Sequence, residues 1–186
     1  MSHPPLFRTL RRMAALTALG GLALVAGCSS VTPAKYAQQG PKFSFRDYFD
    51  GTVDAWGMFQ SRNGEVIKRF KVTLKGTWEG QNGTLDENFV YADGTTEKRL
   101  WKIRQTGPDS YTATAGDIIG EAKGEEAGPA IRYNYTMAIP VSGTTYHFQF
   151  DDWMYQIDDE VVLNRATMSK FGVRLGEVTL SFRKRR

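Results

Sequence analysis

The feature that most constrains the fold of this chain is an alternation of apolar and polar residues that begins near Phe43. From Val66 to Trp78, most residues at even positions are apolar, while charged residues and threonines dominate the odd positions. A second run, from Ile131 to Ile139, alternates in the same way. A period of two places successive side chains on opposite faces of a strand. These runs therefore predict strands with one dry face and one wet face.

Turn-forming dipeptides separate the alternating runs. Asn and Gly tolerate the positive φ angles of tight hairpins, so we expect hairpin turns at Asn63-Gly64, Asn82-Gly83, Asp93-Gly94 and Ser142-Gly143. Residues 43–50 have room for one short helical turn. The pattern predicts nine or ten strands, at residues 52–61, 64–78, 83–91, 95–106, 110–116, 117–124, 129–140, 144–157, 160–168 and 173–183.

Strands joined in sequence by short turns form an antiparallel meander. Closing such a meander removes its exposed edges. The predicted fold class is therefore all-β, a single antiparallel meander closing into a lipocalin-like (calycin-type) barrel of about 8–10 strands. A sandwich of two sheets is the structural alternative.

Two of the predicted strands change phase. Phe148 and Phe150 are apolar at even positions, whereas Trp153 and Tyr155 are apolar at odd ones. The change predicts a β-bulge or bend at Asp151-Asp152. A similar change near the C-terminus predicts another irregularity across Gly176.

The N-terminus has the order of sequence regions that is typical of an export signal. Three arginines precede an uncharged stretch that ends in Val25-Ala26-Gly27-Cys28, which has the form of a bacterial lipobox. We expect a signal peptide over residues 1–27, a lipidated Cys28 with a flexible tether over 28–42, and the β-barrel domain over 43–186. A short membrane anchor and an unlipidated signal are the alternatives. A free tether of 13 residues would reach ~45 Å.

The residues after Cys28 predict the location of the protein in the cell, and the charge of the chain narrows the range of partners. Serines rather than aspartate follow the cysteine, which favours the outer membrane, with the protein facing the periplasm. The chain has 24 basic and 20 acidic residues, but three arginines belong to the signal and four basic residues end the chain. Because the body between is slightly acidic, we expect no nucleic acid as partner. The lipid anchor gives a membrane as partner.

Six sequence runs carry a resemblance to a known family: Gly83–Gly94, Arg99–Ile103, Asp117–Ala122, Gly128–Ala130, Asp151–Tyr155 and Asn164–Gly172. They resemble a family of uncharacterised proteobacterial lipoproteins, domain-of-unknown-function family 3833. The resemblance covers about residues 45–183 and implies a lipoprotein with a lipocalin-like barrel, without an established reaction or ligand.

The inventory of reactive side chains argues against common enzyme chemistry. His147 is the one histidine after the signal, and Cys28 is the only cysteine. A hydrolytic triad and a conventional zinc site are therefore not expected, and we assign no catalytic residue, metal or cofactor. Asp151 and Asp152 are the candidate functional bulge. They would serve acid–base chemistry or calcium binding, or else bond to nearby backbone or to a basic side chain such as Arg165.

Large aromatic side chains on the dry faces suggest a binding lumen. The leading hypothesis is a barrel that binds a lipid or another small hydrophobic molecule. The alternatives are an interaction protein with a filled barrel, and a lipid-modifying enzyme that uses Asp151 and Asp152. The candidate ligand-lining residues are Phe70, Trp78, Trp101, Tyr133, Tyr135, Phe148 and Trp153.

Overall fold

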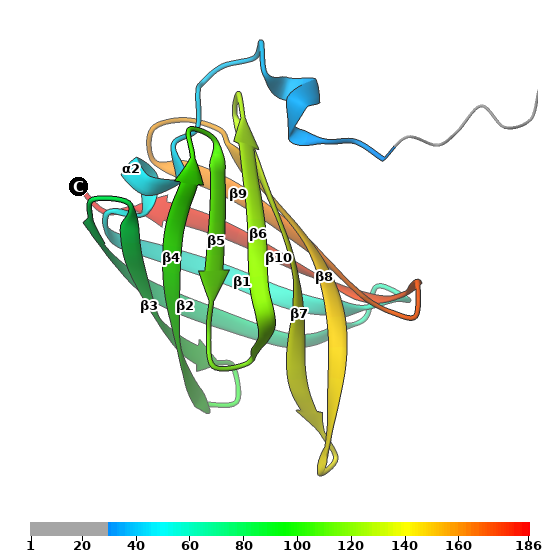
Figure 1. Ribbon diagram of the computed structural model, residues 1–186. Helices are drawn as coiled ribbons and strands as arrows, with labels where there is room; N and C mark the ends of the chain where they lie inside the picture. The colour runs from blue at the N-terminus through cyan, green and yellow to red at the C-terminus, as the bar shows by residue number, and fades with distance from the viewer. Residues whose placement is uncertain (1–29) are drawn as a thin grey trace, which may run out of the picture. The chain divides into compact units, whose positions relative to one another are not determined.

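A computed structural model describes residues 30–186, so the expected signal peptide and Cys28 lie outside the described residues. Ten antiparallel strands close into one barrel, in which each strand pairs with its neighbours in sequence and β1 pairs with β10 (Figure 1). This confirms the predicted barrel over the sandwich. The strands are β1 (Gly51–Ser61), β2 (Val66–Glu79), β3 (Asn82–Tyr91), β4 (Thr96–Gly107), β5 (Ser110–Thr114), β6 (Ile118–Ala127), β7 (Ala130–Val141), β8 (Thr144–Gln156), β9 (Val161–Lys170) and β10 (Val173–Lys184).

One predicted turn is displaced. Asn82 and Gly83 belong to β3, and the turn before them is made by residues 80 and 81, with Gly80 at a φ of 58°. Gly83 has another purpose, because a Cβ atom at this position would lie 2.7 Å from the Trp78 ring. The glycine that looked like a turn residue therefore makes room for an aromatic side chain on the neighbouring strand.

The predicted bulge at Asp151-Asp152 is wrong. Both residues pair in unbroken register with β7 and with β9, so the phase of β8 does not change. Trp153 consequently lies on the outer face. Its aromatic character reflects cover from outside, since the Tyr36 ring contacts Trp153 with centroids 6.1 Å apart. The irregularity expected at Gly176 is confirmed by a register shift between Arg174 and Gly176.

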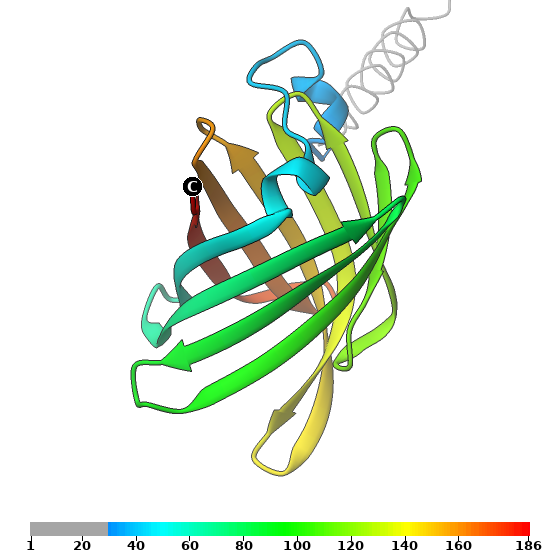
Figure 2. The same cartoon turned by 90° about the vertical axis from the view of Figure 1, so that its left-hand side faces the viewer.

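A short helix, α2 (Phe45–Phe49), lies across one end of the barrel, which we call the closed end (Figure 2). Ser44 caps it by accepting a hydrogen bond from the Asp47 amide at 3.2 Å. Phe45, Tyr48 and Phe49 are buried. Helix and barrel meet at Gly76, where a Cβ atom would lie only 1.7 Å from the Phe49 carbonyl oxygen.

The segment expected to be a tether is packed on the barrel from Pro33 onward. The 3-10 helix η1 (Pro33–Tyr36) begins with the buried Pro33. The Phe43 amide donates to the carbonyl of Gly128, in the turn between β6 and β7 at the closed end. Gly128 has a φ of 55°, and a Cβ atom there would overlap the Tyr36 carbonyl. The segment therefore contacts the closed end of the barrel before α2 begins.

Within residues 30–186, no helix is long and apolar enough to cross a membrane.

Candidate ligand-binding site

The barrel encloses a cavity of about 760 Å³. Phe45 and Phe49 of α2 form its floor at the closed end. At the other end, which we call the open end, the cavity is lined by Ile67, Lys68 and Val141, whose side chains are exposed to solvent. The lumen is therefore hollow, with a mouth opposite α2.

Five of the seven predicted lining residues face this cavity, and two do not. Trp78 packs at the closed end against Phe45, with ring centroids 6.3 Å apart, and it is not part of the cavity wall. Trp153 lies on the outer face because β8 has no bulge. The five that line the cavity are Phe70, Trp101, Tyr133, Tyr135 and Phe148.

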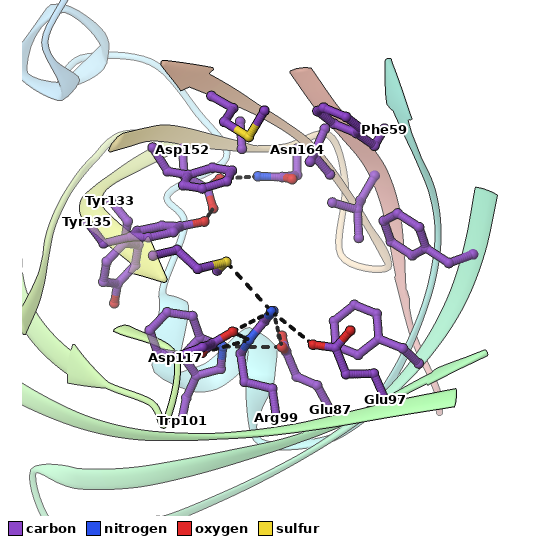
Figure 3. A pocket seen from close by; sticks show the side chains of 18 of the residues that line it. Phe59, Glu87, Glu97, Arg99, Trp101, Asp117, Tyr133, Tyr135, Asp152 and Asn164 are labelled. Carbon is purple, nitrogen blue, oxygen red and sulfur yellow. Dashed lines mark hydrogen bonds and ion pairs between the residues drawn. The ribbon is translucent and has the colours of Figure 1, made fainter. Parts of the chain in front are cut away.

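Two groups of polar side chains interrupt the apolar wall, and Figure 3 shows them on opposite sides of the lumen. The first group centres on Arg99 of β4. Its guanidinium is 2.9 Å from Asp117, 3.4 Å from Glu87 and 3.5 Å from Glu97. Trp101 donates its indole N–H to Glu87 at 3.2 Å. One cation is thus surrounded by three carboxylates.

Burial perturbs this group in a consistent way. It raises the pKa of Glu87 to about 7, against the opposing effects of Arg99 and the Trp101 hydrogen bond. For Arg99, burial favours the neutral form, but the attraction of Glu87 and Asp117 outweighs it and the pKa is raised. Arg99 therefore stays charged while Glu87 titrates near neutral pH.

The second group centres on Asp152 of β8. One carboxylate oxygen accepts a hydrogen bond from the Tyr135 hydroxyl at 3.0 Å, and the other accepts from the Asn164 side-chain amide. Burial raises the pKa of Asp152 to about 6, although both hydrogen bonds lower it. Among residues 30–186, no basic side chain forms an ion pair with Asp152.

Asp151 and Asp152 have separate environments. Neighbouring residues in a strand point to opposite faces, and Asp151 forms an ion pair with Arg132 at 2.6 Å on the outer face. The two carboxylates therefore do not form one acid–base or calcium site. In the part of the chain that the structure describes, no group of three or more acidic, histidine or cysteine side chains is placed to hold a metal ion.

Sequence reasoning missed most of the polar lumen. The signal was available, since Glu87, Arg99 and Asn164 occupy inward positions of strands whose neighbouring inward residues are mostly apolar. A polar residue in the apolar phase of a strand is expensive to bury without a purpose. These residues also fall in the runs that carry the family resemblance, as do Asp117 and Asp152.

The closed ten-strand meander around a ligand-sized cavity defines a lipocalin-like barrel protein. The chain belongs to the family described as a protein of unknown function (DUF3833), whose sequence model matches residues 22–184. No curated protein matches the sequence significantly. Among solved structures, the fold is similar to that of the S-type phycobiliprotein lyase CPES from Guillardia theta. The TM-score is 0.56 at 6% identity, and the match covers 84% of this chain and 99% of that one.

Proposed function

We propose that this protein binds a lipid or another small hydrophobic molecule inside its barrel, as a lipoprotein of the outer membrane that faces the periplasm. The observation that carries the binding function is the hollow lumen of about 760 Å³. Sites for small molecules typically measure ~300–1,000 Å³ and combine apolar walls with a few polar groups. The lumen has both properties.

The alternative of a filled barrel is disfavoured by the same cavity. In small barrels without a ligand, side chains fill the interior. Here the apolar residues leave a continuous space between α2 and the open end. The alternative of an enzyme using paired aspartates loses its basis, because Asp151 and Asp152 face opposite sides of β8.

The address rests on the sequence around Cys28. Diacylglycerol on a cysteine, with a further acyl chain, anchors a protein firmly because each buried methylene contributes ~0.8 kcal/mol. Changing Cys28→Ser should move the protein out of the membrane fraction, as measured by immunoblotting of fractionated cells. Retention of the variant in the outer membrane would contradict lipid anchoring at this residue.

Native mass spectrometry of the full chain tests ligand binding. We expect a reproducible bound mass that organic solvent extracts. Ala166→Trp, which places a large ring in the lumen from β9, should abolish the bound mass. The matched control is Leu163→Trp on the outer face of the same strand, where the leucine is 46% exposed. A folded Ala166→Trp protein that retains the ligand would exclude the lumen as the binding site.

A further inference from the structure

The charges that line the lumen are unbalanced. Four carboxylates face the cavity, from Glu87, Glu97, Asp117 and Asp152, against the two cations Arg99 and Lys68. Inside a cavity with apolar walls, fixed charges act more strongly on a ligand than they would in bulk water. The surplus of negative charge therefore affects whether the site accepts a cationic or an anionic head group.

Arg99 is the obvious partner for an anionic head group, but three carboxylates already compensate its charge. Its guanidinium bonds to Asp117 through Nε and to Glu87 through Nη1, and Glu97 lies beside Nη2. A fatty acid carboxylate or a phosphate approaching Arg99 would meet electrostatic repulsion from these three carboxylates.

Lys68 does not supply a second anion site at depth. It is exposed at the open end, where its ammonium lies 4.9 Å from the centroid of the Tyr91 ring. An apolar ligand filling the lumen would place its polar group either at this mouth or against the inner polar groups. Of the inner groups, the one centred on Asp152 has no cation of its own.

The Asp152 carboxylate accepts hydrogen bonds but has no positively charged partner among residues 30–186. Its two present partners, Tyr135 and Asn164, are neutral donors. The Tyr135 ring, whose hydroxyl bonds to Asp152, is stacked on Phe150 at 5.2 Å and in edge contact with Trp101 at 5.8 Å. A carboxylate beside aromatic rings is a favourable environment for an ammonium group, which gains both an ion pair and cation–π attraction.

We propose that the ligand is an apolar molecule with a protonated amine, and that Asp152 binds its ammonium group. This inference rests on the proposed function, since it assigns the chemical class of the molecule in the lumen. The ammonium would donate a hydrogen bond to the Asp152 carboxylate and supply the missing cation. The hydrocarbon part would occupy the apolar cavity between α2 and the open end.

The test compares three probes with one chain length: dodecylamine, dodecanol and dodecanoate. Each displaces the neutral fluorophore N-phenyl-1-naphthylamine from the full chain carrying Cys28→Ser, at pH 7.5 and below the micellar concentration of each probe. We expect dodecylamine to bind at least about tenfold more tightly than dodecanoate, with dodecanol between them. Asp152→Asn should bring the amine-to-alcohol affinity ratio close to one.

Asp151→Asn is the matched control, because the neighbouring carboxylate lies on the outer face and pairs with Arg132. This variant should keep the amine preference. If Asp152→Asn fails to fold, the pH dependence of the unsubstituted site decides. Dodecylamine affinity should fall between pH 7.5 and pH 5 as Asp152 is protonated, whereas dodecanol affinity should not. Charged groups near or across from Asp152 are Asp151, Glu87, Glu97, Asp117 and Arg99.

The outcomes separate the inference from the function beneath it. If dodecanoate binds most tightly, the amine assignment is overturned while ligand binding stands. An amine preference that survives Asp152→Asn overturns the assignment to this residue. Failure of all three probes and of the fluorophore to bind would overturn the proposed function itself.

Discussion

Buried carboxylates shape the stability of this protein residue by residue. Burial raises the pKa of Asp152 to about 6 and of Glu87 to about 7, above the ordinary values of 3.8 and 4.5. Between about pH 4 and pH 7 the folded protein therefore holds more protons than the unfolded chain. Stability from these two groups is consequently lost as pH rises through that window.

Asp152→Asn should remove the contribution of that residue to this pH dependence. The amide is uncharged at every pH, so we expect the ligand-free variant to gain about 1–3 kcal/mol at pH 7.5 and little at pH 4. Thermal unfolding followed by circular dichroism at the two pH values measures the difference. An equal effect at both pH values would show that the charge of Asp152 is not its cause.

Replacing the cation at the centre of the first polar group should have the opposite sign. Arg99→Gln leaves Glu87 and Asp117 without their partner, and we expect a loss of roughly 2–4 kcal/mol at pH 8. The loss should shrink at pH 5, where Glu87 is protonated. Lys102→Gln, on the exposed face of the same strand, should change stability by less than about 0.5 kcal/mol. Chemical denaturation at both pH values makes the comparison.

At the scale of elements, the contact between α2 and β2 depends on the absence of one side chain. Gly76→Ala would force the Phe49 carbonyl away from the barrel, so we expect a loss of at least about 2 kcal/mol and an exposed cavity floor. In Gly107→Ala, the nearest heavy atom to the new Cβ lies 3.7 Å away, and the barrel should retain its stability. Denaturation and fluorophore binding measure the two effects. Equal stability of both variants would contradict a tight contact at Gly76.

Individual strands were predictable where one face is uniformly apolar. In β2 and β7 the alternation alone sets both the element and its orientation, and the ten strands match the expected ranges closely. The strand β8 was harder, because the outward rings of Trp153 and Tyr155 imitate a core face. Their cover comes from Tyr36, more than a hundred residues earlier in the chain. Local periodicity carries no information about such a distant contact.

The polar lumen escaped prediction for a related reason. Alternation indicates which residues point inward, but it does not indicate that Glu87 and Arg99, from two strands, meet Asp117, from the turn between β5 and β6. Glu87 and Arg99 are register partners across β3 and β4, whereas Asp117 contacts Arg99 from a turn, and local periodicity carries no information about that contact. Asp152 was singled out from the sequence, yet as half of a pair. The unbroken register of β8 places it in the lumen without Asp151.

At the scale of the whole molecule, the segment from Pro33 to Phe43 contacts the barrel, so the free tether is shorter than the sequence predicted. Only residues 29–32 separate Cys28 from the first residue fixed on the barrel, a reach of at most roughly 17 Å. If Cys28 carries the lipid, the closed end is the part held beside the bilayer.

Membrane-depth measurements with spin labels check this geometry. On the lipidated protein in vesicles, a label at Asp159, in the loop between β8 and β9 at the closed end, should be the closer to the headgroups. A label at Ser142, in the turn between β7 and β8 at the open end, should report water. The reverse pattern would contradict the arrangement.

In this arrangement the closed end of the barrel would face the membrane, and the open end would face the aqueous space. A ligand leaving the open end would not pass directly into the bilayer that anchors the protein. It would instead pass through the aqueous space to a carrier or acceptor outside that bilayer. The contacts of Pro33, Tyr36 and Phe43 with the barrel would thus direct the open end, and any ligand that leaves it, away from the anchoring membrane.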